Sequence, residues 1–146
     1  MLLYLDTCAV QRPLDDQSQL RIRVEADIVL AVIAAVEANE LELVSSDVLR
    51  FETENNPLPT RRDFARRVLA LATVDTASTP EVAKQARGYE QAGIKPLDAV
   101  HLASAVAASA ELFCTVDDEF LRKARTVNTG ATRVVSPVEL ITEVAP

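Results

Sequence analysis

Residues 95–120 read Lys-Pro-Leu-Asp-Ala-Val-His-Leu-Ala-Ser-Ala-Val-Ala-Ala-Ser-Ala-Glu-Leu-Phe-Cys-Thr-Val-Asp-Asp-Glu-Phe. The first part predicts a buried helix from Pro96 to about Ala110, because proline is tolerated in a first turn and the segment is apolar nearly all round. The apolar run Leu112–Thr115 predicts a buried strand, and Asp118–Thr126 predicts the next helix. A helix, a strand and a helix in direct succession indicate an α/β fold with a parallel sheet.

The same alternation continues on both sides of this stretch. Further strands are predicted at Leu2–Leu5, Leu41–Ser45 and Arg133–Ser136, and a polar loop with Pro13, Asp15 and Asp16 follows the first of them. Further helices are predicted at about Gln19–Ala38, from the N-cap Ser46 to near Asn55, at about Thr60–Ala72, at Pro80–Ala92 with Gly93 closing it, and at Pro137–Val144. We expect one three-layer α/β/α domain over residues 1–146, with a central, mainly parallel sheet of four to five strands. The pattern does not define the strand order.

Composition excludes several classes of protein. The chain has 146 residues, with 22 acidic and 15 basic side chains and a net charge of −7, which argues against binding nucleic acid by bulk electrostatics. Its three glycines cannot form a phosphate-binding loop, so kinase, P-loop and Rossmann cofactor functions are excluded. The two cysteines lack zinc-site spacing, and the uncharged runs are too short to span a membrane. We expect a cytoplasmic protein.

Four acidic residues stand where parallel strands are predicted to end or helices to begin. Asp6 follows the first strand, Glu52 lies in the helix after the second, Asp98 lies in the first turn of the Pro96 helix, and Asp117 follows the third strand. Ligands of open α/β sheets bind outside these carboxyl ends. Each of three acids also has a purely structural explanation: Asp117 as a helix N-cap, Asp98 as a partner of the helix dipole, and Asp6 as a turn residue.

Glu52 and Asp98 are less easily explained in this way. At 100° per residue Glu52 points into the apolar face of its helix, whereas Glu54 points away. Asp98 is partly sunk with its apolar helix. Carboxylates that converge in a partly buried place repel each other unless a cation holds them, and oxygen ligands suit Mg²⁺ or Mn²⁺ better than zinc.

The residues around these acids resemble the acidic signature of the PIN-domain family, small nucleases that include VapC-like toxins. The resemblance covers residues 2 to about 142. It rests on Leu5-Asp6-Thr7, on Ser46 followed six residues later by Glu52, on the block from Lys95 to Ala105, and on Thr115-Val116-Asp117-Asp118-Glu119-Phe120. The chain departs from the family pattern at Cys8, where many members carry an asparagine.

The resemblance implies a function. Asp6, Glu52, Asp98 and Asp117 would hold one or two Mg²⁺ or Mn²⁺ ions, with Asp118 or Asp15 as further helpers, and the chain would hydrolyse RNA phosphodiester bonds. It also implies a homodimer and a cognate antitoxin protein. Thr7 and Thr115 would donate hydrogen bonds to the carboxylates or to a phosphate.

Several basic residues, the single histidine and the two cysteines are further candidates for a functional role. Lys95 and Arg12 are candidate phosphate contacts, as is the cluster Arg61, Arg62, Arg66 and Arg67, which more commonly forms a solvated face. His101 is expected to be a satisfied core histidine rather than a base, and Cys8 and Cys114 to be small reduced core residues.

Two other functions remain open. A non-catalytic PIN-fold module that binds nucleic acid or protein would keep the fold and bind Mn²⁺ and RNA without turnover. A receiver-like phosphoacceptor also has acids at strand ends, but the early acidic pair and the late lysine that it needs are not evident here.

Overall fold

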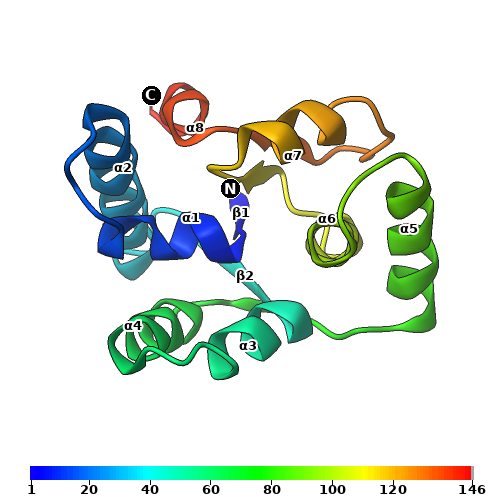
Figure 1. The fold of residues 1–146 in the computed structure, drawn as a ribbon, viewed down its shortest axis with the longest axis horizontal. Helices are drawn as coiled ribbons and strands as arrows, with labels where there is room; N and C mark the ends of the chain where they lie inside the picture. Colours follow the sequence, from blue (N-terminus) through cyan, green and yellow to red (C-terminus); the bar gives the residue numbers. More distant parts are fainter. Residues whose placement is uncertain (146) are drawn as a thin grey trace.

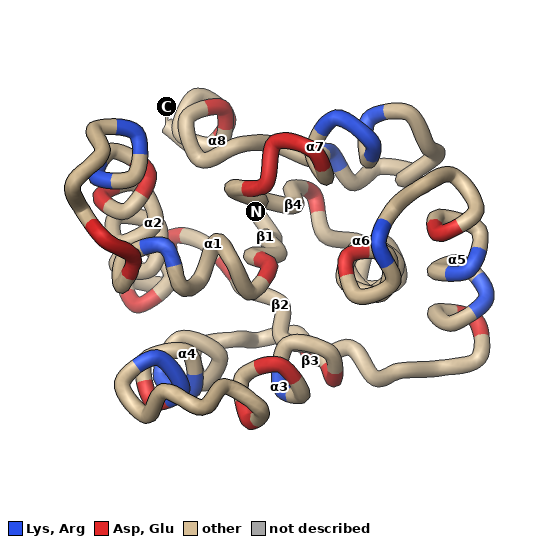
Figure 2. Tube along the Cα trace, in the orientation of Figure 1, with Lys and Arg blue, Asp and Glu red and all other residues tan. Residues whose placement is uncertain are grey.

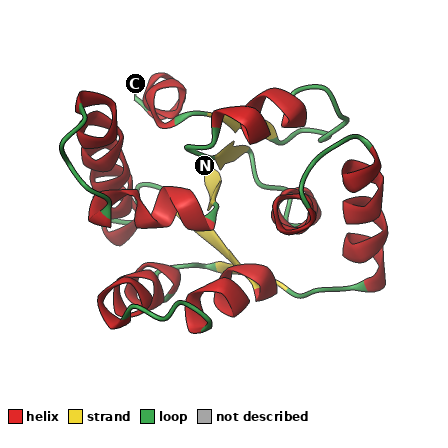
Figure 3. Ribbon diagram, in the orientation of Figure 1, coloured by secondary structure: helices red, strands yellow, loops and turns green. Residues whose placement is uncertain are grey.

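The structure is a computed structural model and describes residues 1–145. A five-stranded sheet forms its centre. Every neighbouring pair of strands runs parallel, in the order β3-β2-β1-β4-β5. The strands are β1 (Leu2–Leu5), β2 (Glu42–Ser46), β3 (Val74–Thr76), β4 (Leu112–Cys114) and β5 (Arg133–Val135). Figure 3 shows these short strands in the middle of the molecule with helices around them.

Helices connect the strands and cover both faces of the sheet (Figure 1). They are α1 (Thr7–Gln11), a 3₁₀ turn (Arg12–Leu14), α2 (Leu20–Glu37), α3 (Asp47–Glu54), α4 (Pro59–Leu69), α5 (Pro80–Gln91), α6 (Pro96–Ala107), α7 (Asp118–Ala124) and α8 (Pro137–Val144). None of the helices within residues 1–145 is both long and apolar enough to cross a membrane.

Successive residues of each strand enter two separate hydrophobic cores, because side chains alternate between the faces of a sheet. Tyr4 and Phe113 pack with α5, α6 and α7 on one face. Leu3, Leu43 and Leu112 pack with α1, α2, α4 and α8 on the other face. The predicted three-layer α/β/α architecture is confirmed, with five strands.

The strand order places a topological switch point between β1 and β4. The chain runs outward from β1 through β2 to β3, then crosses back to β4 on the other side of β1 and continues to β5. The loops after β1 and β4 therefore leave the sheet in opposite directions and open a crevice at its carboxyl edge. Asp6 follows β1 and Asp117 lies three residues beyond the end of β4, so both stand at this point.

Two elements differ from the sequence prediction. The segment after Asp6 is not a polar loop, because Thr7–Gln11 form a helix and Arg12–Leu14 a 3₁₀ turn. Five residues are too few to show a helical period, and it is the Asp6 carboxylate, accepting the Ala9 N–H, that caps this helix. The prediction also lacked β3, which has only three residues and an acidic centre at the sheet edge.

Helix ends follow local backbone geometry. The Pro96 helix ends at Ala107 rather than about Ala110, because Ser109 has a positive φ of 57° that no right-handed helix accommodates. The predicted stop at Gly93 is confirmed, since this glycine has a φ of 99° just after α5.

Candidate functional site

Asp6 is the buried member of the acidic site. It is only 3% exposed, and its Oδ1 accepts the Ala9 N–H at 3.0 Å and the Cys8 thiol at 3.1 Å. Burial raises the pKa of this carboxyl, although the charge of His101 and the surrounding hydrogen bonds oppose the effect. Asp6 therefore caps α1, whereas its predicted structural role was that of a turn residue, and it also lies at the switch point.

Glu52 projects from the second turn of α3 toward α1. Ser46 caps this helix by accepting the Leu49 N–H at 3.2 Å, which sets the direction of its first turns. The Oε1 atom of Glu52 accepts the Thr7 hydroxyl at 2.8 Å and bonds to His101 Nε2. Its side chain is 24% exposed, and that of Glu54 is 53% exposed and bonds to Arg66, so the predicted inward and outward directions are confirmed.

The two bonds to Glu52 also control its protonation. Burial acts to raise the pKa of this carboxyl, but the hydrogen bond and charge of His101, together with the Thr7 hydroxyl, leave the pKa below its ordinary value. Glu52 is therefore held in its charged form beside the other acids.

Asp98 lies in the first turn of α6, where Pro96 begins the helix. Its side chain is partly buried and has no hydrogen-bond partner in the part of the chain that the structure describes. Burial first, and then the negative charges of Asp6 and Asp117, raise the pKa of this carboxyl to about 6, with a further contribution from Glu52. Asp98 is thus close enough to the other three predicted acids for their negative charge to act on it.

Asp117 begins α7 as its N-cap. Its Oδ1 accepts the Phe120 N–H at 3.1 Å, and its own N–H donates to the Thr115 hydroxyl at 3.2 Å. Thr115 is buried at the end of β4, with its hydroxyl 3.5 Å from the Cys8 thiol. Figure 2 shows acidic positions where α6 and α7 begin and beside the end of β1.

Cys8 does not belong to the hydrophobic core, contrary to the prediction. It is exposed, and its thiol bridges Asp6 and Thr115 at the edge of the site. Burial of the sulfur and the charge of Asp6 raise the pKa of this thiol, so it stays protonated and donates to the carboxylate. Cys114 is buried, as predicted.

His101 is buried, as predicted for a core histidine, but it also contacts the site. It is 2% exposed, Nδ1 lies 2.7 Å from the Tyr4 hydroxyl, and Nε2 bonds to Glu52. The sequence reasoning missed Tyr4 altogether, because a tyrosine inside an apolar strand carries no signal that distinguishes it from a core residue. The position of His101 one turn after Asp98 was the only available hint.

Of the other predicted residues, Lys95 lies at the site, whereas Arg12, Asp15 and Asp118 are engaged in ion pairs elsewhere. Lys95 precedes α6 and lines a small pocket with Asp98, Asp117 and Lys123, so the structure brings it to the site. Lys123 itself was not predicted, and it pairs with Glu119 at 2.9 Å.

Arg12 and the two helper acids are engaged elsewhere. Arg12 pairs with Asp15 at 2.9 Å and with the buried Glu25 at 3.1 Å, and Asp118 pairs with Arg21 at 2.6 Å. Each of these charges therefore has a structural partner.

The donor atoms of the site suit a hard divalent cation. Carboxylate and hydroxyl oxygens lie in the same part of the molecule, and a bound positive charge would relieve the repulsion that acts on Asp98. In their present conformations, the side chains within residues 1–145 form no group of three His, Cys, Asp or Glu that could hold a metal ion. Asp6, Glu52 and Asp117 instead use an oxygen for the helix caps and hydrogen bonds described above.

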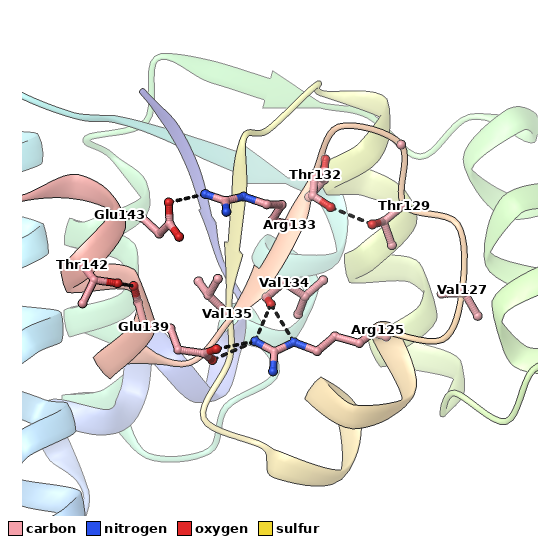
Figure 4. Close-up of a pocket in the computed structure, with 12 residues that line it drawn as sticks. Arg125, Val127, Thr129, Thr132, Arg133, Val134, Val135, Glu139, Thr142 and Glu143 are labelled. Atoms are coloured by element: carbon pink, nitrogen blue, oxygen red, sulfur yellow. Dashed lines mark hydrogen bonds and ion pairs between the residues drawn. The ribbon is translucent and has the colours of Figure 1, made fainter.

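A second hollow in the structure lies beside the edge strand β5 and has a volume of about 420 Å³. Figure 4 shows that its basic side chains are already used: Arg125 bonds to Glu139 and to the Val134 carbonyl, and Arg133 bonds to Glu143. Both arginines of this hollow are thus paired with glutamates.

The fold and the acidic site together define a class of protein, the three-layer α/β domains that gather carboxylates at a switch point. The PIN domain family model matches residues 3–126, and the chain belongs to the PIN domain family. No curated protein gives a significant match to the sequence. Among solved structures, the chain is similar to VapBC2 from Rickettsia felis bound to a DNA fragment from its promoter, with a TM-score of 0.56 and 10% identity. The alignment covers 93% of this chain and 98% of the other, and the likeness concerns the fold.

Proposed function

We propose that this chain is a metal-dependent endoribonuclease whose acidic site consists of Asp6, Glu52, Asp98 and Asp117. The observation that carries the proposal is the position of Asp98, which lies in the first turn of α6, lines a small pocket with Asp117, and is near enough to Asp6 and Glu52 to feel their charge. Burial first, and then these three carboxylates, raise its pKa to about 6. Such strained groupings of like charge are typical of functional sites, and the chain belongs to the PIN domain family.

The four carboxylates would hold Mg²⁺ or Mn²⁺. The bound cation supplies positive charge that activates water and stabilises a phosphate under attack. Thr7 orients Glu52, and Thr115 supports the loop that carries Asp117. Lys95, beside Asp98 and Asp117, is placed to contact a phosphate of the RNA. Hydrolysis adds water to phosphorus and releases the 3′ oxygen as a hydroxyl.

Cleavage of an RNA pool in Mg²⁺ or Mn²⁺ tests this proposal. Asp6→Asn and Asp98→Asn are each expected to abolish cleavage, and EDTA is expected to do the same to the wild-type protein. Glu54→Gln is the control, because Glu54 lies two residues from Glu52 but points to solvent and pairs with Arg66. An unchanged rate in either aspartate variant would refute the assignment of the site.

A non-catalytic PIN-fold module is the second candidate. It is favoured by one observation, that within residues 1–145 the carboxylates are not drawn together around a single point. The same experiment distinguishes the two functions. Binding of Mn²⁺ and RNA by the wild-type protein, with no cleavage of any RNA in the pool, would select the module.

We also propose that the chain is the toxin of a toxin–antitoxin pair and forms a homodimer. Support comes from its family and from the likeness of its fold to a VapBC complex. Expression of the chain alone is expected to arrest growth, and co-expression of a small protein encoded just upstream is expected to restore it. Light scattering on the purified chain tests the dimer.

A further inference from the structure

A continuous path of hydrogen bonds joins the core to the acidic site. The Ser46 hydroxyl lies 2.7 Å from the Tyr4 hydroxyl, which in turn lies 2.7 Å from His101 Nδ1. His101 Nε2 bonds to Glu52 at the far end. Ser46, Tyr4 and His101 are each no more than 2% exposed, so water does not compete for these bonds.

The partners at the two ends of the path determine where the protons lie. Glu52 Oε1 also accepts the Thr7 hydroxyl, so this oxygen acts as an acceptor and His101 Nε2 must carry the hydrogen of their bond. Ser46 Oγ already accepts the Leu49 N–H, which leaves its own hydrogen free for the Tyr4 oxygen. The Tyr4 hydroxyl accepts that hydrogen and donates its own onward, because a phenol both accepts and donates. Every polar group of the path therefore has a partner when the Tyr4 hydroxyl donates its hydrogen to His101 Nδ1.

We infer that Tyr4 is a positioning residue: its hydroxyl donates to Nδ1, fixes the orientation of the His101 ring with Nε2–H directed at Glu52, and thereby holds Glu52 in place for the proposed reaction. The role of Glu52 in binding a cation rests on the proposed function, whereas the hydrogen bonds among Tyr4, His101 and Glu52 do not. Both bonds to Glu52, from His101 and from Thr7, end on Oε1. The other carboxylate oxygen, Oε2, receives no hydrogen bond from the described residues and is left for a cation. Partners of this kind fix the orientation of ligands.

The chain offers an unusually clean test of the path, because it contains one histidine and two tyrosines. Protein labelled with ¹⁵N-histidine shows the ring nitrogens of His101 alone, and protonated and unprotonated nitrogens resonate far apart. At pH 8 the wild-type ring is expected to carry its hydrogen on Nε2 and none on Nδ1. In Tyr4→Phe the Nδ1 signal is expected to move to that of an unprotonated nitrogen that accepts no hydrogen bond, because the Tyr4 hydroxyl is its donor.

Tyr89→Phe is the matched control. Tyr89 is 5% exposed, and its hydroxyl bonds to Gln85 and to the Asn128 carbonyl, away from His101. Both variants lose one buried hydroxyl, but only Tyr4→Phe changes the path, so the control is expected to leave the ring signals unchanged. A wild-type ring with its hydrogen on Nδ1, or a ring unaffected by Tyr4→Phe, would overturn the inference.

Titration with Mn²⁺ alone tests the consequence for Glu52. Tyr4→Phe is expected to weaken Mn²⁺ binding about tenfold, which is typical of the loss of a ligand's hydrogen-bond partner, and Tyr89→Phe by less than about twofold. Equal affinity in both variants would refute the positioning role. If the wild-type ring behaves as expected but the protein neither binds Mn²⁺ nor cleaves RNA, the path is supported and the proposed function is the part that fails.

Discussion

Asp98 is a partly buried carboxyl whose ionisation is opposed by burial and by neighbouring negative charges. It lies on a helix that is otherwise packed into the core, and it faces Asp6 and Asp117 without a hydrogen bond of its own within the described chain. Such a carboxyl weakens the fold when it is charged and no cation is bound. A binding site of this kind therefore trades stability for function.

We predict that Asp98→Asn stabilises the metal-free protein at alkaline pH. The native pKa of about 6 exceeds the ordinary value of 3.8, so ionised Asp98 disfavours the folded state above pH 6. Because the side chain is partly solvated, the expected gain at pH 8 is about 1–2 kcal/mol. It should shrink between pH 6 and 4 and vanish below, where both states hold the proton.

Urea unfolding of both proteins in EDTA, from pH 4 to 8, measures this difference directly. Addition of Mn²⁺ should then reverse the order at pH 8, because the cation binds the wild-type site. A variant whose stability parallels that of the wild type at every pH would show that Asp98 is not electrostatically strained.

Single residues also show how far sequence reasoning reaches. The inward direction of Glu52 could be predicted, since a helix repeats every 3.6 residues and Val48 marks its buried face. The exposure of Cys8 could not, because it depends on a helix, α1, that the pattern does not reveal. The bond between His101 and Tyr4 joins residues 97 positions apart and depends on tertiary contact alone.

Among the elements, α1 is the one on which the site most depends. Asp6 caps its beginning, and Thr7 in its first turn orients Glu52. Its end is held by Gln11, which donates to the Arg61 carbonyl at 3.0 Å, and by Arg12, which pairs with the buried Glu25. A five-residue helix is not stable alone, so these tertiary contacts maintain it.

We predict that Arg12→Met destabilises the protein far more than Arg66→Met. Glu25 is 2% exposed, and loss of Arg12 leaves it with only the 3.4 Å contact to Arg21, at an expected cost of about 2–4 kcal/mol. Arg66 pairs with Glu54 on the surface, where the cost should stay below about 1 kcal/mol. Equal midpoints of chemical unfolding for the two variants would contradict this account of α1.

The elements missed by sequence reasoning share a physical cause. Both lack a recognisable local pattern: α1 has five residues, too few to show a helical period, and β3 has three residues with an acidic centre instead of an apolar run. The longer helices and the strands β1, β2, β4 and β5 were predicted because their apolar residues enter the two cores. Strand order depends on how the crossovers pack, and no local pattern contains it.

For the molecule as a whole, the excess of acid divides into the four carboxylates of the proposed site and the acids outside it. The four site carboxylates account for four of the seven net negative charges. About half of the basic side chains, including Arg21, Arg66 and Arg125, are paired with carboxylates, so the charge available to an RNA backbone is reduced. Recognition of RNA should therefore be local, around Lys95 and the acidic site.

We predict a shallow dependence of RNA affinity on salt. Two phosphate contacts to a single strand correspond to about a sevenfold loss of affinity between about 50 and 200 mM monovalent salt. Binding to a catalytically inactive Asp98→Asn protein, measured by fluorescence anisotropy, tests this. A loss of several hundredfold would reveal an extended basic surface and contradict the local mode of binding.

The central claim is that four carboxylates at the switch point form a cation-dependent nuclease site. The most direct measurement compares RNA cleavage by the wild type, Glu52→Gln and Glu54→Gln in Mn²⁺. These glutamates share one helix, but only Glu52 faces the site. We predict at least about a hundredfold loss of rate for Glu52→Gln, about 3 kcal/mol in activation free energy, and a rate within about twofold of wild type for Glu54→Gln. Equal rates for the two variants would contradict the account.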